Sequence, residues 1–319
     1  MISRLRNRGV PLDISTIVVW ALAAATFIAA LVTIQAFLVI GNLKITLAQV
    51  LVLAFASAGE TLVIIAGGID VSVQGMISAA AVLCAQLAHG SSSALWWVIP
   101  VVLCVAVVVG IVNGVGVVYF GVSPIMMTIA TNVIVSGAAA TEVGFGSLSS
   151  APPALQQVAN GELAGVPISV VILLILTVVM TVILKMTTLG RRIYAVGSSP
   201  LVSELSGVRS APVIIASYVM SSLGAACAGM VLLAYLVTGT LGIGDPYLFT
   251  AIAAAAVGGI SLAGGQGNFL GVLGAVFFLT LLTLVLTAQG VSTGLLDVVY
   301  GLAILVCVWL ASRNAQSTS

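Results

Sequence analysis

Charged side chains are scarce in this sequence. Only 5% of its 319 residues are Asp, Glu, Lys or Arg, whereas 61% are hydrophobic. A soluble domain carries about 25% charged residues, so no soluble fold could cover this much apolar surface. The net charge of +1 gives no basic field that would attract nucleic acid. We therefore expect an all-α integral membrane protein that contacts the lipid bilayer and no nucleic acid.

Residues suited to catalysis and metal binding are also few. The sequence has one histidine, His89, and four cysteines scattered through apolar runs without metal-ligand spacing. Its two lysines, Lys44 and Lys185, lie outside any GxxxxGK[ST] loop, and no HExxH or GxSxG motif occurs. The sequence therefore predicts a protein that is not an enzyme and that binds neither a metal nor a nucleotide itself.

Long apolar runs, separated by Gly, Pro, Ser or charged residues, indicate about ten transmembrane helices in one polytopic domain, residues 1–319. A spanning helix needs about 20 apolar residues. The helices are predicted at about 14–40, 43–66, 71–88, 95–120, 123–141, 166–186, 212–237, 246–263, 268–288 and 294–311. The first run is too long for a signal-peptide core of about 7–15 residues, so we interpret it as a retained helix.

The basic residues predict the orientation of these helices. Four lie near the ends of the chain and four in or beside one hydrophilic loop, namely Arg4, Arg6, Arg8 and Arg313, and Lys185, Arg191, Arg192 and Arg209. The positive-inside rule then makes both termini and the loop at about 187–212 cytoplasmic, and leaves only Lys44 outside. The main external loop covers about 142–166. Four acids are predicted on the external side or near that interface, namely Glu142, Glu162, Asp245 and Asp297.

Several polar residues fall inside predicted spans, where they must face protein or water and not acyl chains. They are Gln49, Ser57 and Glu60 in the second helix, Asn113 in the fourth, and Thr128, Asn132 and Ser136 in the fifth. One interpretation is the wall of a path for a polar, uncharged solute, and the other is hydrogen bonding between helices. Glu60 is the one acid well inside a span, and both a functional and a structural role stay open for it.

Two Gly-Gly-Ile sequences, at 67–69 and 258–260, form a faint internal repeat. Transporters are often built from repeated halves whose helices are interrupted near the substrate path. We interpret Gly67, Gly68, Gly258 and Gly259 as hinges or close-packing points where helices break. Asp70 follows the first pair and is predicted to cap the third helix by accepting backbone N–H bonds.

Four blocks of the sequence resemble one family of membrane proteins. They cover residues 66–73 (AGGIDVSV), 121–131, 189–208 and 253–271, and they appear in the order found in permeases of ribose/xylose/arabinose-type ABC importers, within the branched-chain-permease-like superfamily. The chain departs from the family pattern at Gln74, where glycine is usual. It departs again at 247–250, where Tyr-Leu-Phe-Thr replaces Tyr-Glu-Leu-Asp and removes two acids.

The resemblance implies a transport subunit of the bacterial inner membrane, which forms the translocation path for a monosaccharide or similar small polar solute. It implies a periplasmic solute-binding protein, ABC ATPase subunits that carry ATP and Mg, and a second permease as an identical copy or a paralogue. The cytoplasmic loop would then contact the ATPase, and the residues expected to do so are Arg191, Arg192, Tyr194, Glu204 and Arg209.

An ion-coupled secondary transporter of a small polar solute is the alternative function. Such a transporter needs an intramembrane carboxylate or a sodium site, and Glu60 is the residue that could serve. Uptake driven by an ion gradient, with no ATPase present, would decide for this alternative.

Overall fold

The computed structural model describes residues 14–143 and 150–316, and nearly all of them are helical. In chain order the elements are α1 (Ile14–Thr33), α2 (Ile40–Ile65), α3 (Val73–Ala88), η1 (Ser92–Ala94), α4 (Leu95–Val118), α5 (Pro124–Val143), α6 (Pro153–Asn160), β1 (Glu162–Leu163), β2 (Val166–Pro167), α7 (Ile168–Met186), α8 (Thr188–Ser198), α9 (Pro200–Leu205), α10 (Ser210–Leu236), α11 (Tyr247–Val257), α12 (Phe269–Ala288) and α13 (Thr293–Gln316). The predicted cytoplasmic anchors Arg4, Arg6 and Arg8, and the side chain of Arg313, lie outside the described part.

Each of the ten predicted apolar runs contains a helix, which confirms the all-α membrane class. Seven helices in the described ranges are long and apolar enough to cross a membrane, namely α1, α2, α4 with η1, α5, α7, α10 and α12. The predicted boundaries were wrong in three places. The first helix ends at Thr33 and not near residue 40, and the eighth ends at Val257 because a glycine turn follows it. The tenth helix continues to Gln316, past the predicted end at residue 311.

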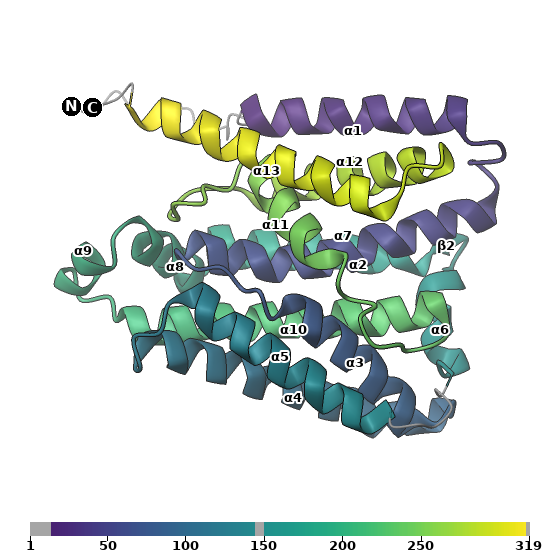
Figure 1. Cartoon of the computed structure of the whole chain (residues 1–319), viewed down its shortest axis with the longest axis horizontal. Coiled ribbons are helices and arrows are strands. Elements are labelled where there is room, and N and C mark those ends of the chain that lie inside the picture. Colours follow the sequence, from purple (N-terminus) through teal and green to yellow (C-terminus); the bar gives the residue numbers. More distant parts are fainter. Residues whose placement is uncertain (1–13, 144–149, 317–319) are drawn as a thin grey trace.

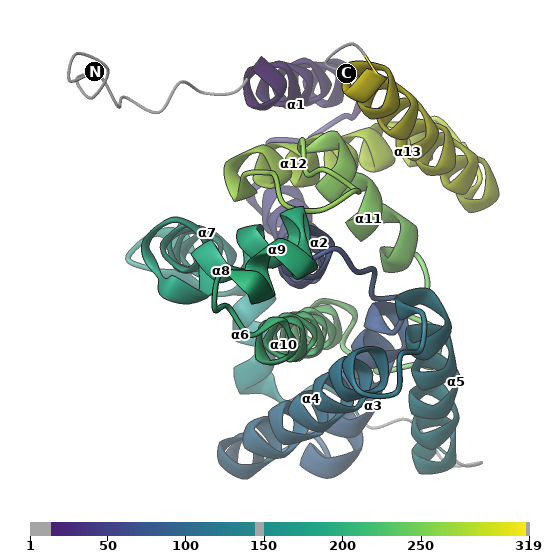
Figure 2. The ribbon, with the colours of Figure 1, turned by 90° about the vertical axis from the view of Figure 1, so that its left-hand side faces the viewer.

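Helix α2 lies at the centre of the bundle, between α10 on one side and α11 and α12 on the other (Figure 2). The helices meet where glycine lets the backbones approach. A Cβ built on Gly59 of α2 would lie 2.6 Å from the Cα of Ser221 on α10. One built on Gly110 of α4 would lie 2.4 Å from the Cα of Val219, also on α10. Small residues at such contacts are how helices associate in lipid, where no hydrophobic driving force acts between them.

The two ends of the bundle differ in what they carry. Figure 1 shows α8 and α9 at the left end, toward which α1 begins and α13 ends, and α6 and the β1–β2 hairpin at the right end. At the right end, Nζ of Lys44 lies 2.8 Å from Oε1 of Glu162, the one ion pair within the part of the chain that the structure describes. Both long loops contain short helices, with α6 in the loop predicted at about 142–166 and α8 and α9 in the loop predicted at about 187–212.

The two glycine pairs form turns with the same backbone geometry. Gly67 has φ 90° and Gly259 has φ 87°, and in both turns the following N–H donates to the carbonyl five residues earlier, at 2.9 and 3.0 Å. This is the Schellman geometry that ends helices at a left-handed residue. By backbone geometry, Gly67 therefore corresponds to Gly259. This differs by one residue from the alignment of the Gly-Gly-Ile sequences, which pairs Gly67 with Gly258. We call these the two glycine turns.

Helices α3 and α11 are too short to cross a bilayer, with 16 and 11 residues against the roughly 20 required. The connection 237–246, which precedes α11, runs back along α3. The N–H of Gly244 donates to Oγ of Ser78 at 3.0 Å, and a Cβ on Gly239 would lie 2.8 Å from the carbonyl oxygen of Ala81. The N-termini of both short helices consequently lie inside the bundle.

Candidate functional site

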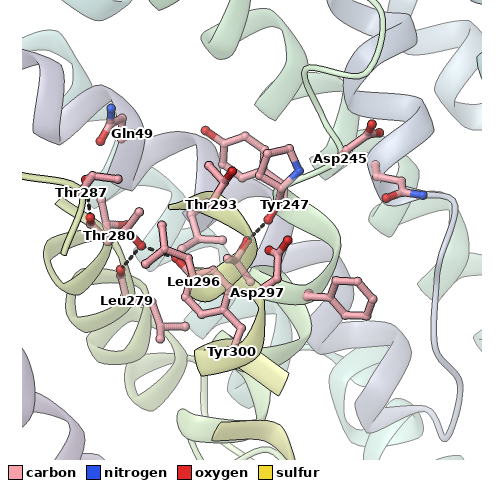
Figure 3. Close-up of a pocket in the computed structure, with 16 residues that line it drawn as sticks. Gln49, Asp245, Tyr247, Leu279, Thr280, Thr287, Thr293, Leu296, Asp297 and Tyr300 are labelled. Atoms are coloured by element: carbon pink, nitrogen blue, oxygen red, sulfur yellow. Dashed lines mark hydrogen bonds between the residues drawn. The ribbon is translucent and has the colours of Figure 1, made fainter. Parts of the chain in front are cut away.

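The structure contains a cavity of about 740 Å³ between α2, α3, α11, α12 and α13 (Figure 3). This volume falls in the range of small-molecule sites, about 300–1,000 Å³. Its polar lining consists of two amides, two carboxylates and seven hydroxyls, namely Gln49 and Gln74, Asp245 and Asp297, and Thr250, Thr280, Thr283, Thr287, Thr293, Tyr247 and Tyr300. Among the described residues, no lysine, arginine or histidine lines it.

Helix α12 supplies one wall of the cavity. Thr280, Thr283 and Thr287 lie on one helical face because residues three and four apart are neighbours on a helix. Oγ1 of Thr283 donates to the carbonyl of Leu279 at 2.7 Å, and its hydroxyl also bonds to that of Tyr300 on α13. The Thr280 hydroxyl is buried and has no partner in the described part of the chain.

The N-termini of the two short helices form the opposite side of the cavity. Gln74 lies in the first turn of α3, and Asp245 and Tyr247 lie at the start of α11. The first N–H groups of a helix have no partner within it, and the helix dipole adds positive potential there. Half-helix ends of this kind are how transporters bind polar groups inside a membrane. Asp245, predicted on the external side, is exposed at the open side of the cavity, because the 237–246 connection runs back along α3.

Of the polar residues predicted to form the path, Gln49 alone lines this cavity. Its Nε2 donates to Oη of Tyr235 at 3.2 Å. Asn132 and Ser136 of α5 lie against α3 instead. A Cβ on Gly75 would meet Oδ1 of Asn132 at 2.4 Å and Oγ of Ser136 at 3.0 Å. These two side chains therefore lie at the contact between α3 and α5.

Glu60 and Asp70 are fully buried beside the first glycine turn. The N–H of Asp70 donates to Oε1 of Glu60 at 3.2 Å, and Oδ1 of Asp70 accepts the N–H of Ser72 at 3.0 Å together with the Ser72 hydroxyl. The Asp70 carboxyl thus bonds within the turn that precedes α3, at the position where a capping role was predicted.

Ser57, Asn113 and Thr128 are buried, and the last two bond to the segment between α2 and α3. Oγ1 of Thr128 accepts the N–H of Val71 at 3.0 Å, and Nδ2 of Asn113 donates to Oγ of Ser72 at 2.8 Å. Helices α4 and α5 therefore supply partners to the backbone and side chains between α2 and α3, which lipid could not do.

Helix α8 lies against the end of α2, at the first glycine turn, and against the loop that follows the second. Gly197 is so close to the end of α2 that a Cβ would fall 1.7 Å from the carbonyl oxygen of Ile65, and the same oxygen accepts the N–H of Gly265 at 2.8 Å. Oη of Tyr194 donates to the carbonyl of Gly267 at 2.8 Å. Burial raises the pKa of the Tyr194 phenol, so it keeps the proton that it donates.

The other residues predicted to contact an ATPase are exposed at this end of the bundle, namely Arg191, Arg192, Glu204 and Arg209. Helix α9 adds an apolar surface that the sequence analysis did not include. Leu201, Val202 and Leu205 are 69%, 60% and 81% exposed.

The threonines of α12 are functional candidates that the sequence analysis missed. Their i, i+3, i+7 spacing in an apolar helix was a readable signal. Asp297 and Tyr300 of α13 gave no such signal, because only the tertiary arrangement brings them to the cavity.

Comparison with known proteins identifies the family to which the chain belongs. The profile of the family described as "Branched-chain amino acid transport system / permease component" matches residues 42–308. The "Probable ABC transporter permease protein y4mJ" of Sinorhizobium fredii is 32% identical over 269 residues, which cover 83% of this chain and 79% of the relative. The "Autoinducer 2 import system permease protein LsrD" of Photorhabdus laumondii is 26% identical over 254 residues, 78% of this chain and 76% of the relative. No solved structure matches the chain.

The resemblance found in the sequence blocks is thereby confirmed, and family membership implies ATPase subunits and a periplasmic binding protein as partners. The chain belongs to this permease family and is a multi-pass transport subunit, not an enzyme, of an ABC importer in the bacterial inner membrane.

Proposed function

We propose that the cavity between α2, α3, α11, α12 and α13 is part of the translocation path and receives a monosaccharide or similar uncharged polar solute. The observation that carries this proposal is the lining, which within the described ranges combines amides, carboxylates and hydroxyls with no basic side chain. Carboxylate and amide oxygens accept hydrogen bonds from solute hydroxyls, and the threonine hydroxyls both donate and accept. A phosphorylated or other anionic solute would meet Asp245 and Asp297 with no compensating cation.

Three of the residues that depart from the family pattern fall at this cavity, whereas Leu248 does not line it. Gln74, Phe249 and Thr250 replace residues usual in the family, and all three line it. Thr250 donates to the carbonyl of Pro246 at 2.8 Å and so lies within the first turn of α11. The concentration of these differences at one cavity supports a role in adapting the permease to its own solute.

Ten spans with both termini in the cytoplasm are the topology that best fits the bundle. The basic residues of the 187–212 loop lie at the end toward which α1 begins and α13 ends (Figure 1). Lys44 and Glu162, both predicted outside, form their ion pair at the other end. The short helices α3 and α11 each make up a span with the extended segments beside them.

The cavity is open on one side, where Asp245, Asp297 and the ring of Phe249 are exposed. Carboxylates within the membrane must face protein or water. A second permease, as an identical copy or a paralogue, would close this side, so that the path runs between the two subunits.

The exposed end of the α8–α9 segment is the proposed ATPase contact. Arg191 and Arg192 supply charge, and Leu201, Val202 and Leu205 supply apolar surface that does not lie among the spans. ATP and Mg would bind to the partner subunits, since this chain has no P-loop.

When the ATPase subunits close, their movement would be transmitted to the cavity through α8. This helix touches the end of α2 and the loop after α11, and α11 is a single 11-residue helix from its glycine turn to Tyr247 at the cavity. Displacing α8 therefore moves the wall that carries Phe249 and Thr250. ATP binding contributes energy only through its different affinity for the two states of the assembly.

Reconstitution tests the proposed function. The permease in liposomes with its ATPase and binding protein should take up an uncharged monosaccharide only with ATP inside and the binding protein outside. Uptake by the permease alone under a sodium or proton gradient would contradict the proposal and favour the ion-coupled alternative.

Leu205→Asp should abolish the gain in ATPase activity that the loaded binding protein produces, because it places a charge in the proposed apolar contact. The measurement is ATP hydrolysis by the reconstituted complex. Leu163→Asp is the matched control, since Leu163 is 61% exposed at the opposite end of the bundle, and it should leave ATPase assembly intact. Equal ATP hydrolysis by the two variants would show that α9 is not part of the ATPase contact.

Thr280→Val should lower uptake without lowering stability. The Thr280 hydroxyl has no protein partner, so its loss leaves nothing unpaired, whereas a lost solute hydrogen bond costs about 0.5–1.5 kcal/mol, or roughly 2- to 12-fold in uptake at low solute. Uptake and thermal unfolding are measured together. Thr177→Val on α7, away from the cavity, is the control, and unchanged uptake in Thr280→Val would exclude Thr280 from the path.

A further inference from the structure

Five oxygen atoms beside the first glycine turn have no hydrogen-bond partner within 3.5 Å in the described part of the chain, although their residues are at most 1% exposed. They belong to α2, to the turn itself, to α4 and to α10, and they are Oε2 of Glu60, Oδ2 of Asp70, Oδ1 of Asn113, Oη of Tyr218 and Oγ of Ser221. We call them the buried oxygen cluster. None of them lines the solute cavity.

The contacts around the turn bring these residues together. The N–H of Asp70 bonds to Glu60, and Asn113 bonds to Ser72, whose N–H and hydroxyl bond to Asp70. The Asp70 carboxyl also interacts with the Ser221 hydroxyl. On α10, Tyr218 lies at the turn, because a Cβ on Gly68 would fall 2.6 Å from its Oη.

The charge of this cluster is uncompensated. Neither Glu60 nor Asp70 forms an ion pair with a basic side chain in the described part of the chain. Each carboxyl uses one oxygen for a backbone N–H and leaves the other free. An isolated buried carboxylate is too costly to keep, so it must be neutralised by a proton or a cation.

We propose that the buried oxygen cluster binds a single Na⁺ ion. All five free atoms are oxygens, which are the ligands that hard cations prefer. A cavity of about 40 Å³ lies beside Tyr218 of the cluster. Mg²⁺ keeps several waters, and Ca²⁺ takes 6–8 oxygens, more than the five of this cluster.

A bound Na⁺ would join the turn between α2 and α3 to α4 and α10. It would stabilise the folded permease without entering the solute cavity. The proposal is therefore independent of which solute the permease carries.

The test is thermal unfolding of the purified full-length permease in NaCl and in choline chloride of equal ionic strength. A ligand that binds only the folded state stabilises it in a saturable way. We expect the unfolding temperature to rise by at least about 2–4 °C in NaCl, the shift that corresponds to roughly 1 kcal/mol. An equal unfolding temperature in both salts, with a dependence on pH alone, would mean that protons neutralise the cluster and would overturn the proposal.

Asp70→Asn, Tyr218→Phe and Ser221→Ala locate the site. The first removes a charge and could impair folding, so the other two, which each delete one oxygen, carry the test. Both should reduce the sodium-dependent shift by more than half. Thr280→Val removes a buried, unpartnered hydroxyl elsewhere and should keep the full shift. An undiminished shift in Tyr218→Phe and Ser221→Ala would place the ion outside this cluster.

Discussion

The carbonyl oxygen of Ile65, the last residue of α2, accepts the N–H of Gly265 from the loop after α11 at 2.8 Å. The last carbonyls of a helix have no partner within it, and inside a membrane protein each must find one. This contact satisfies such a carbonyl and holds the first glycine turn against the loop that follows the second. Gly197 of α8 packs on the same carbonyl, where no side chain would fit.

The two glycine turns also determine where the short helices α3 and α11 lie. Because α2 and α11 end at glycine turns, the chain can start α3 within the bundle and return from α11 into α12. The N-termini of α3 and α11 then meet at the cavity, where they contribute Gln74 and Tyr247. The same interruption thus provides a surface for α8 at one end and a polar cavity at the other.

The sequence predicted the features that depend on local composition. The apolar runs predicted the position of every long helix, and the four family-like blocks predicted that the chain is a permease. The path residues depended on tertiary structure instead. Asp245 reads as an external acid in the sequence, yet the 237–246 connection runs back along α3 and brings it to the cavity. Asn132 reads as a path residue by its helical spacing, but it faces Gly75 on a neighbouring helix. Periodicity shows that a face is polar and does not show which helix lies against it.

Hydrogen exchange of the backbone amides, measured by mass spectrometry on the complex with its ATPase, tests most directly whether α8 links the ATPase to the glycine turns. The nucleotide-free complex is compared with one trapped with ATP. The account predicts that exchange changes together in 188–205, in 66–72 and in 258–267. A change confined to 188–205, with both glycine turns unaffected, would contradict it.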